Sequence, residues 1–396
     1  MSTLPVSDAI DMAVAELRTR PRIAAWSIWD RHTEPVARSA EDVPWHADAI
    51  TAAWLTATLG AQVEGASALT ATIVGGDDGS SVRRRLHVEW NSAGQAAGLP
   101  AALFTKSTPT LPTRLSAGIA APMEGRFLLT LRPSVAIEAP HCYFSARDAQ
   151  RGRSIHVMED LGVTQGATFF DALSPVDHDQ AQQIVDTLAS LHGTFLSSEN
   201  VLPFGWLGRY EDFHAAADRS GIRAGHDAAM KQAADVIPTS VLNAKAKIWP
   251  AASAALSMHE EIARTVIHSD VHPGNWYRTA AGQMGLCDWA RVCRGHWARD
   301  LAYALMTTLT VEDRRSWERE LIERYLSGLE AHSGIAVMFN EAWLAYRKQS
   351  IAALLMWTPT LCPPAILPAM QPEQVSMVMI ERITQAMHDL DVLSLF

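Results

Sequence analysis

A short polar segment between two apolar runs limits the possible folds of this chain more than any other part of it. Val266-Ile267 precedes the segment His268 to Asn275, whose sequence is His-Ser-Asp-Val-His-Pro-Gly-Asn. A turn at Ala281-Gly282 and a second apolar run follow, and that run ends at Asp288. This order predicts a loop, a strand, a turn and a strand. Acidic side chains then stand at the start of the loop and at the end of the second strand.

The spacing of three side chains in this region suits phosphoryl transfer. Asp270 can accept the proton of an attacking alcohol or orient its hydroxyl group. Asn275, five residues later, can curl back to bind a divalent metal, and Asp288 can bind the same metal from the facing strand. Carboxylate and amide oxygens are the hard ligands that magnesium prefers. The transfer itself needs in-line positioning and neutralisation of phosphate charge.

A zinc-ligand cluster is a second interpretation of the same segment. His268, Asp270 and His272 alternate, so a strand could project their side chains to one side. Zinc needs three or four converging His, Cys or carboxylate ligands. The Pro-Gly step, Asn275 and Asp288 are expected of a kinase loop and are not required by zinc. A metal-dependent hydrolase therefore stays an alternative function at this point.

The first part of the chain has a β-rich pattern. We expect a helical, partly irregular extension over 1–45 and then a short helix that ends at Gly60. Strands are predicted at 69–74, 82–90, 101–106 and 155–158. A glycine-rich turn at 75–81 would join the first two strands into a hairpin.

After about residue 165 the pattern becomes helical. Ile184, Leu188 and Leu191 make one apolar face of a helix over 179–196, and His192 beside that face is expected to be a core or interlobe residue. Further helices are expected over 210–265, 311–332, 341–356 and 373–392. The pattern predicts an α+β fold with two lobes, a β-rich lobe over 46–160 and a mainly helical lobe over 161–396.

Composition narrows the class of protein. The 396 residues are 48% hydrophobic, and the formal net charge of −10 argues against nucleic-acid binding. Four dispersed cysteines without a CxxC pair, and a first stretch without the pattern of a signal peptide, favour a reducing, cytoplasmic compartment. Four prolines between Ile351 and Met370 argue against a membrane span there.

The loop resembles that of the aminoglycoside phosphotransferase and choline kinase superfamily, which has a protein-kinase-like fold. Asp270 and Asn275 have the D-x4-N spacing of kinases, and Asp288-Trp289 stands where protein kinases have Asp-Phe-Gly. Gly295 followed by Asp300-Leu301-Ala302 also matches the superfamily pattern. The resemblance implies that Asp300 holds the catalytic loop.

Lys106 and Glu124 support the same resemblance from the first half of the chain. Lys106 ends a predicted strand, and Glu124 lies on a predicted helix over 123–131, so the two could form the kinase Lys–Glu ion pair. Their surroundings resemble the ecdysteroid-kinase-like branch, in the segments Leu99-Pro100, Phe104–Lys106, Glu124–Phe127, Pro140–Tyr143 and Met158–Leu161. The resemblance covers roughly 60–310.

The resemblance also implies where a nucleotide binds. The adenine would be bound by the backbone of a hinge made of Met158, Glu159, Asp160 and Leu161. The phosphates would be covered by the glycine-rich turn, with Gly79, Ser80 and Ser81. This turn departs from the protein-kinase G-x-G-x-x-G pattern, so an ordinary hairpin turn without a role in binding is the alternative interpretation. For Glu159-Asp160 the alternative is a solvated surface turn.

We therefore expect ATP- and Mg2+-dependent phosphorylation of a hydroxyl group on a small molecule. Asp270 would be the catalytic base or would position the hydroxyl group. His268 and His272 would order the loop. The predicted catalytic residues are therefore Asp270, His268 and Asn275. Asn275 and Asp288 would hold Mg2+. A catalytically inactive nucleotide-binding protein on the same fold is the alternative.

The acceptor is expected to be bound by the helical part of the chain. Large apolar side chains there suggest a lipophilic or sterol-like alcohol, with core packing as the alternative: Trp206, Trp343, Met356 and Trp357. An aminoglycoside acceptor would call for strongly acidic surroundings instead.

Overall fold

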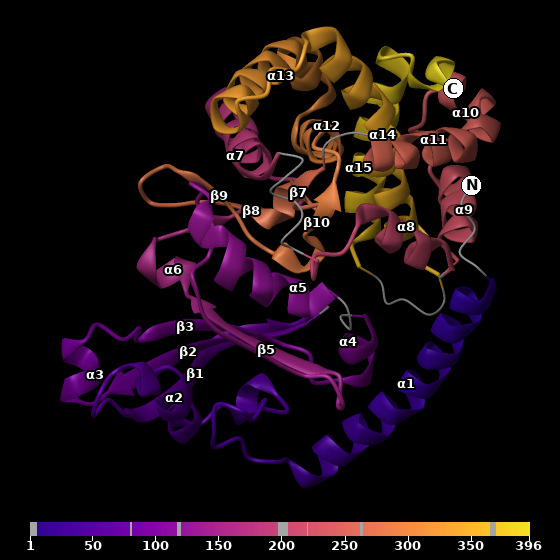
Figure 1. Ribbon diagram of the computed structural model, residues 1–396. Helices are drawn as coiled ribbons and strands as arrows, with labels where there is room; N and C mark the ends of the chain where they lie inside the picture. Colours follow the sequence, from indigo (N-terminus) through magenta and orange to yellow (C-terminus); the bar gives the residue numbers. More distant parts are fainter. Residues whose placement is uncertain are drawn as a thin grey trace. The chain divides into compact units, whose positions relative to one another are not determined.

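The chain divides into two units in a computed structural model that describes residues 6–79, 81–116, 120–196, 205–219, 221–261, 264–364 and 370–396 (Figure 1). The N-terminal unit comprises Met1–Thr130 and Pro140–Gly166, and the C-terminal unit comprises Leu131–Ala139 and Ala167–Phe396. The first unit is built on a β-sheet and the second is mainly helical, which confirms the predicted α+β fold class. The domain limits at 46 and 161 stay predictions.

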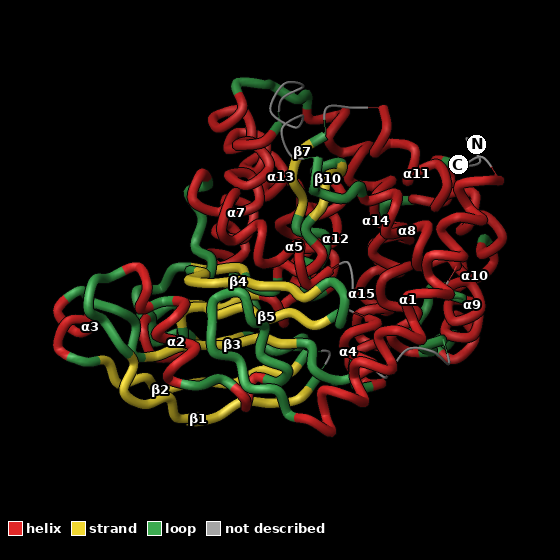
Figure 2. The backbone as a smooth tube through the Cα atoms, turned by 60° about the horizontal axis from the view of Figure 1, so that its bottom comes forward, coloured by secondary structure: helices red, strands yellow, loops and turns green. Residues whose placement is uncertain are grey.

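Five antiparallel strands form the sheet of the N-terminal unit, in the spatial order β1-β2-β3-β5-β4 (Figure 2). The strands are β1 (Ala68–Asp78), β2 (Val82–Trp90), β3 (Ala102–Ser107), β4 (Cys142–Asp148) and β5 (Arg153–Glu159). The side chains of Val82, Leu86, Val88 and Trp90 in β2 are buried, as their partial alternation predicts. Strand β4 was not predicted, because its side chains are mostly half-buried and lack a clear period of two.

The glycine-rich segment 75–81 differs from the prediction. Gly75 and Gly76 belong to β1, where they lie opposite Arg85 and Arg84, and the strand continues to Asp78. Gly76 has φ +145°, and a Cβ atom there would lie 2.9 Å from the Cα atom of Arg84. Glycine is therefore used for a close approach at a strand irregularity rather than for a turn. The turn itself is shorter, and Ser80 lies outside the described residues.

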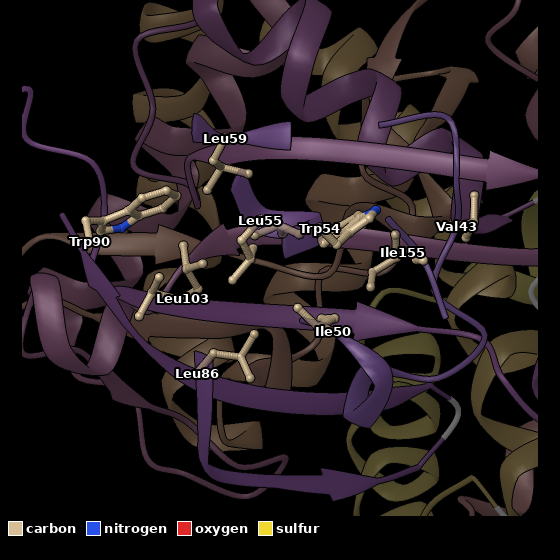
Figure 3. Packing of buried hydrophobic residues seen from close by; sticks show 12 residues of the cluster. Val43, Ile50, Trp54, Leu55, Leu59, Leu86, Trp90, Leu103 and Ile155 are labelled. Atoms are coloured by element: carbon tan, nitrogen blue, oxygen red, sulfur yellow. The ribbon is translucent and has the colours of Figure 1, made fainter. Parts of the chain in front are cut away.

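One face of the sheet is covered by helix α2 (Ala52–Thr58). Trp54 and Leu55 of this helix belong to one buried cluster with Leu86, Leu103 and Ile155 of three strands (Figure 3). The Thr51 side chain accepts a hydrogen bond from Trp54 N and so caps the helix. Burying side chains of this size contributes about 2 to 3 kcal/mol each, so this cluster stabilises the sheet.

Helix α1 (Val6–Thr33) is attached to the same unit by one buried carboxylate. Asp30 is fully buried, and its oxygens lie 2.8 Å from Arg114 Nη2, 3.2 Å from Arg153 Nη1 and 3.3 Å from Arg151 Nη1. Arg114 lies in α4 (Leu111–Ser116), Arg153 is the first residue of β5, and Arg151 lies in the turn before it. Burial lowers the pKa of the Arg114 guanidinium despite the opposing effect of Asp30. A charge buried to this degree is stable only when it is paired.

The remaining helices of the N-terminal unit are short. They are α3 (Ser92–Ala96), α5 (Ala120–Arg126), which carries Glu124, and α6 (Leu161–Thr164). The predicted helix over 123–131 is therefore two elements, because α5 is followed by a π-helical turn over Phe127–Leu131.

Helices build most of the C-terminal unit, as predicted. They are α7 (His178–Phe195), α8 (Tyr210–Arg219), α9 (Ile222–Gln232), α10 (Thr239–Asn243), α11 (Ile248–Glu261), α12 (Ala298–Thr308), α13 (Val311–Ser333), α14 (Phe339–Leu361) and α15 (Glu373–Asp389). A capping box of Asp177 and Gln180 begins α7. Helix α14 continues past its predicted end, because Pro359 in its last turn removes only one backbone donor. In the described part of the chain, no helix is long and apolar enough to cross a membrane.

Five short strands complete the C-terminal unit. They are β6 (Thr168–Phe169), β7 (Thr265–Ile267), β8 (Trp276–Arg278), β9 (Met284–Leu286) and β10 (Cys293–Gly295). Strand β8 pairs with both β6 and β9, and β7 pairs with β10. The loop that joins β7 to β8 is the polar segment on which the functional prediction rests.

The C-terminal unit contains three buried histidines whose lowered pKa values should make its folding stability decrease in acid. Burial lowers the pKa of His226 and of His296 to about 4, and that of His259 to about 3, from an ordinary value of 6.5. The unfolded chain therefore binds more protons between about pH 4 and 6.5, so the stability that these groups contribute is complete above pH 6.5 and is lost as the pH falls. For His226 the loss amounts to about 3 kcal/mol at pH 4.

Urea unfolding between pH 7 and pH 4 tests this expectation. The His226→Gln variant should lose part of the pH dependence, whereas His87→Gln, at an exposed histidine, should keep all of it. Equal slopes of stability against pH for the wild type and His226→Gln would contradict the prediction.

Candidate active site

Two backbone hydrogen bonds to a buried carboxylate fix the start of the loop. Asp300, in the first turn of α12, accepts from His268 N at 2.6 Å and from Ser269 N at 2.9 Å. Ser269 has φ 61°, a left-handed conformation that is unfavourable for serine, and its hydroxyl group donates to the Arg291 carbonyl oxygen at 2.9 Å. These bonds hold the strained residue in place, so the predicted structural role of Asp300 is confirmed.

The Asp300 carboxylate has two further partners. His192 Nε2 lies 3.4 Å from Asp300 Oδ2, and His192 Nδ1 lies 2.7 Å from the Tyr325 hydroxyl group. Burial alone would raise the pKa of Asp300, but the hydrogen bond from His192 and the charge of Arg299 outweigh it, so the pKa is lowered. His192 is a fully buried core residue, as predicted.

Asp270 is a partly exposed carboxylate whose backbone and side chain are both held. Its N–H donates to His268 Nδ1 at 3.2 Å, and its carbonyl oxygen accepts from Asn275 Nδ2 at 2.7 Å. Tyr303 donates its hydroxyl hydrogen to Asp270 Oδ1 at 3.2 Å, and His272 Nε2 lies 3.9 Å from the same oxygen. With 23% of its side chain exposed, Asp270 can meet a hydroxyl group from outside the loop.

His268 orders the loop and leaves no nitrogen for a metal. Its Nδ1 accepts from Asp270 N, so its Nε2 carries the hydrogen and donates to the Cys287 carbonyl oxygen at 3.0 Å. Burial lowers the pKa of His268, which keeps the ring neutral. Both ring nitrogens are thus engaged, which argues against the zinc interpretation. The described residues also contain no cluster of three or more His, Cys, Asp or Glu side chains suited to a metal.

Asn275 and Asp288 stand at the same end of the β8–β9 hairpin. Cys287 N donates to the Asn275 carbonyl oxygen at 2.9 Å, which places the residue before Asp288 beside Asn275. Since Asn275 Nδ2 is bonded to Asp270, the amide oxygen is the atom of this side chain that remains for a cation. Asp288 has φ 60° and ψ 66°, a conformation that Asp tolerates better than most residues. An amide oxygen and a carboxylate together fit magnesium.

Tyr303 and Arg299 are site residues that the sequence did not reveal. Tyr303 lies one helical turn after Asp300 in α12, and the carbon of the Arg299 guanidinium lies 4.4 Å from the centre of its ring. Arg299 also donates to the Ser269 carbonyl oxygen at 3.2 Å. Burial and the negative charge of Asp270 raise the pKa of Tyr303 well above its ordinary value, so its hydroxyl group stays a donor.

Replacing Tyr303 with phenylalanine should lower kcat about tenfold, because one hydrogen bond to a charged carboxylate is lost. The ring and its contact with Arg299 remain, so the melting temperature should change little. Steady-state kinetics with circular dichroism melts check this. A lower melting temperature with unchanged kcat would show that Tyr303 is merely structural.

Lys106 and Glu124 form a buried ion pair in the N-terminal unit. Lys106 Nζ lies 2.8 Å from Glu124 Oε2, and their side chains are 14% and 3% exposed. Burial raises the pKa of Cys142 on β4 to about 12, and the charge of Glu124 adds to this effect. Whether Lys106 binds a nucleotide stays a prediction.

The predicted hinge residues have their own partners within the N-terminal unit. Asp160 Oδ2 accepts from Arg85 Nε at 2.8 Å, and Glu159 Oε1 accepts from the Thr164 hydroxyl group at 2.5 Å. The side chains of Met158 and Leu161 are buried. Contact with adenine would therefore be made by the backbone, and it stays a prediction.

The described residues of the hairpin turn are bonded to each other. Gly79 N donates to the Ser81 carbonyl oxygen at 2.9 Å. The Ser81 side chain is buried, and its hydroxyl oxygen has no hydrogen-bond partner among the described residues. The turn thus uses one of the N–H groups that the prediction reserved for phosphate.

The large apolar residues expected near an acceptor differ in their surroundings. Trp357, 2% exposed, has its ring 5.5 Å from that of His272 in the loop, and Met356 Sδ lies 3.7 Å from Arg291 Nη2. Trp343 stacks on Phe339 of its own helix. Trp206 is half-buried. Trp357 thus contacts the loop through His272.

A small cavity is lined by residues of α8, α11 and α14. Most of its lining is apolar, with Tyr210, His214, His259 and Gln349 as polar members. The Tyr210 hydroxyl oxygen accepts from Arg299 Nε at 3.1 Å. Arg299 therefore connects this cavity to Tyr303 and hence to Asp270.

Comparison with known proteins gives several solved structures with similar folds. Choline kinase LicA from Streptococcus pneumoniae is 13% identical with a TM-score of 0.47, over 85% of this chain and 98% of that chain. Plasmodium vivax ethanolamine kinase is 12% identical with a TM-score of 0.45, over 80% of this chain and 81% of that chain. Aminoglycoside phosphotransferase APH(3'')-Id from Streptomyces rimosus, in complex with ADP and streptomycin, is 16% identical with a TM-score of 0.40. The match covers 69% of this chain and 90% of that chain.

A family model decides the relationship. No curated protein matches the chain in a sequence search. The model of the phosphotransferase enzyme family matches residues 111–335, which include Glu124, the loop, Asp288 and Asp300. The resemblance to the aminoglycoside phosphotransferase and choline kinase superfamily is thus confirmed, while the branch within it stays a prediction. Since the match spans more than half of the chain, the chain belongs to the phosphotransferase enzyme family.

Proposed function

We propose that this phosphotransferase moves the γ-phosphoryl group of ATP to a hydroxyl group of a small molecule, with Mg2+ bound by Asn275 and Asp288. The geometry of Asp270 carries the proposal. Its carboxylate is partly exposed, is oriented by Tyr303, and belongs to a loop whose backbone is held by Asp300 and Asn275.

The residues have separate tasks in this reaction. Asp270 accepts the proton of the acceptor hydroxyl group as the hydroxyl oxygen bonds to the γ-phosphorus and the bond to ADP breaks. Lys106, oriented by Glu124, contacts phosphate oxygens of the nucleotide. Magnesium, when bound, neutralises phosphate charge. His268 and His272 order the loop, and Met158–Leu161 bind adenine through the backbone.

We further propose that the acceptor is a lipophilic alcohol. Trp357 contacts the catalytic loop through His272, and its buried indole Nε1 has no hydrogen-bond partner in the part of the chain that the structure describes. An apolar surface with one polar group suits an alcohol on a hydrocarbon framework better than a polycation.

A panel of alcohols tests the proposed function. Purified protein with ATP and Mg2+ should release ADP when the panel includes sterols and other lipophilic alcohols, and less with aminoglycosides or choline. Phosphate on the alcohol, seen by mass spectrometry, identifies the transfer. ATP binding without ADP release across the panel would favour the catalytically inactive alternative. Tight stoichiometric zinc in the purified protein would favour the hydrolase.

A further inference from the structure

The helix that carries Glu124 lies against the sheet at a glycine. Gly125 is the next residue of α5, and it is buried. A Cβ atom on Gly125 would lie 2.7 Å from Ser145 Cβ on β4 and 2.8 Å from His156 Nδ1 on β5. Both distances are shorter than real Cβ contacts, and neither neighbouring atom is the far end of a flexible side chain. Any side chain at Gly125 would therefore push α5 away from the sheet or displace these two residues.

The atoms under Gly125 are connected to Lys106 across the sheet. His156 lies opposite Lys106 in the β3–β5 ladder, and Ser145 lies opposite His156 in the β4–β5 ladder. Directly opposite residues have their side chains on the same face of a sheet. Lys106, His156 and Ser145 thus form one row across three strands, and the Ser145 hydroxyl group lies 2.9 Å from His156 Nδ1.

Helix α5 meets this row at two consecutive residues. Gly125 touches its Ser145–His156 end, while Glu124 reaches its other end, where Lys106 Nζ lies 2.8 Å from Glu124 Oε2. The ion pair is mostly buried, so its energy depends strongly on the separation of the two charges. A displacement of the helix at Gly125 is therefore transmitted to Lys106 through its neighbour Glu124.

We propose that Gly125 is a positioning residue for nucleotide binding, because the absence of a side chain there sets the separation between α5 and the row that contains Lys106. The inference rests on the proposed function, in which Lys106 contacts phosphate oxygens. Gly125 touches no substrate in this role and acts only through Glu124. Ser145 and His156 together limit how close the helix can come.

A double-mutant cycle with magnesium–ADP as the probe tests this. Gly125→Ala should weaken the binding of magnesium–ADP, measured by calorimetry, about tenfold, since one charge-assisted contact is misplaced. Ser145→Gly removes the Ser145 Oγ and Cβ atoms that a side chain at position 125 would meet, and it releases His156 Nδ1 from its hydrogen bond so that this ring can turn away. The variant with both changes should recover to within about threefold of the wild type, and Ser145→Gly alone should bind normally.

Gly94→Ala is the matched control. Gly94 lies in α3 of the same unit, outside the row, and a Cβ atom there would lie 2.9 Å from Trp90 Cβ. This variant should lower the melting temperature as Gly125→Ala does, but it should leave the Kd for magnesium–ADP unchanged. The control separates a loss of stability from a loss of positioning.

The outcomes separate this inference from the function on which it rests. If Lys106→Ala weakens binding while Gly125→Ala does not, only the role of Gly125 is wrong. If Lys106→Ala binds magnesium–ADP normally, the proposed phosphate contact fails and the inference with it. Should Gly125→Ala fail to fold, the doubly changed variant decides: normal Kd supports the proposal, and a tenfold weaker Kd overturns it.

Discussion

Asp270→Asn should lower kcat for phosphoryl transfer about a thousandfold, within the range that a positioned general base contributes. Asparagine keeps the shape of the side chain and a carbonyl oxygen that can accept from Tyr303, but it cannot take the proton of the acceptor hydroxyl group. The KM for ATP should stay close to that of the wild type, because Asp270 is assigned to the acceptor. Steady-state kinetics at saturating ATP measures both constants.

The control for Asp270 is the same substitution at an exposed aspartate. Asp186 forms an ion pair with Arg324 on the surface of the C-terminal unit, and Asp186→Asn should leave kcat unchanged. Both variants should melt within a few degrees of the wild type. If Asp270→Asn keeps kcat within twofold, Asp270 is neither the base nor the group that orients the hydroxyl.

Asp288→Asn should reduce turnover more than a hundredfold at low magnesium, because a carboxylate ligand contributes several kcal/mol to a metal-assisted transition state. Asparagine is the informative replacement, since Asp288 has φ 60° and asparagine tolerates this conformation better than alanine does. It also retains one oxygen. Raising the magnesium concentration should therefore recover part of the activity of Asp288→Asn and less of that of Asp288→Ala.

A magnesium titration of turnover distinguishes ligation from folding. Loss of a ligand shifts the titration to higher magnesium, whereas damage to the fold lowers the plateau at every concentration. The Asp391→Asn variant provides a control, because Asp391 also has a positive φ, of 46°, and is not assigned to the site. A titration of Asp288→Asn that coincides with that of the wild type would remove Asp288 from the metal site.

The loop was predictable because its chemistry is local in sequence. Asp270 and Asn275 lie five residues apart, and strands flank the loop on both sides, so spacing alone predicted which side chains converge. Asp300 was predictable only through the family resemblance, since its bonds to His268 and Ser269 cross about thirty residues. The pattern around it in the sequence is simply that of a buried helix.

Tyr303 was missed because nothing in a sequence distinguishes a tyrosine that donates to a loop carboxylate from one that fills a core. Its role depends on the packing of α12 against the loop. Strand β4 was missed for a related reason. A half-buried strand has no sharp alternation, and its identity comes from pairing with β5. The glycines at 75 and 76 indicated a turn locally, whereas the sheet uses them for close backbone approach.

Helix α1 contributes, through Asp30, a negative charge to a cluster of arginine side chains in the N-terminal unit. The Asp30 carboxylate, with that of Asp148, offsets part of the positive charge of three guanidinium groups that come from two other parts of the unit. A chain shortened to begin after residue 45 would leave these three clustered arginines without the Asp30 carboxylate. Such a protein would carry a local anion-exchange surface, and it would adhere to polyanions and to acidic resins although the complete chain is acidic.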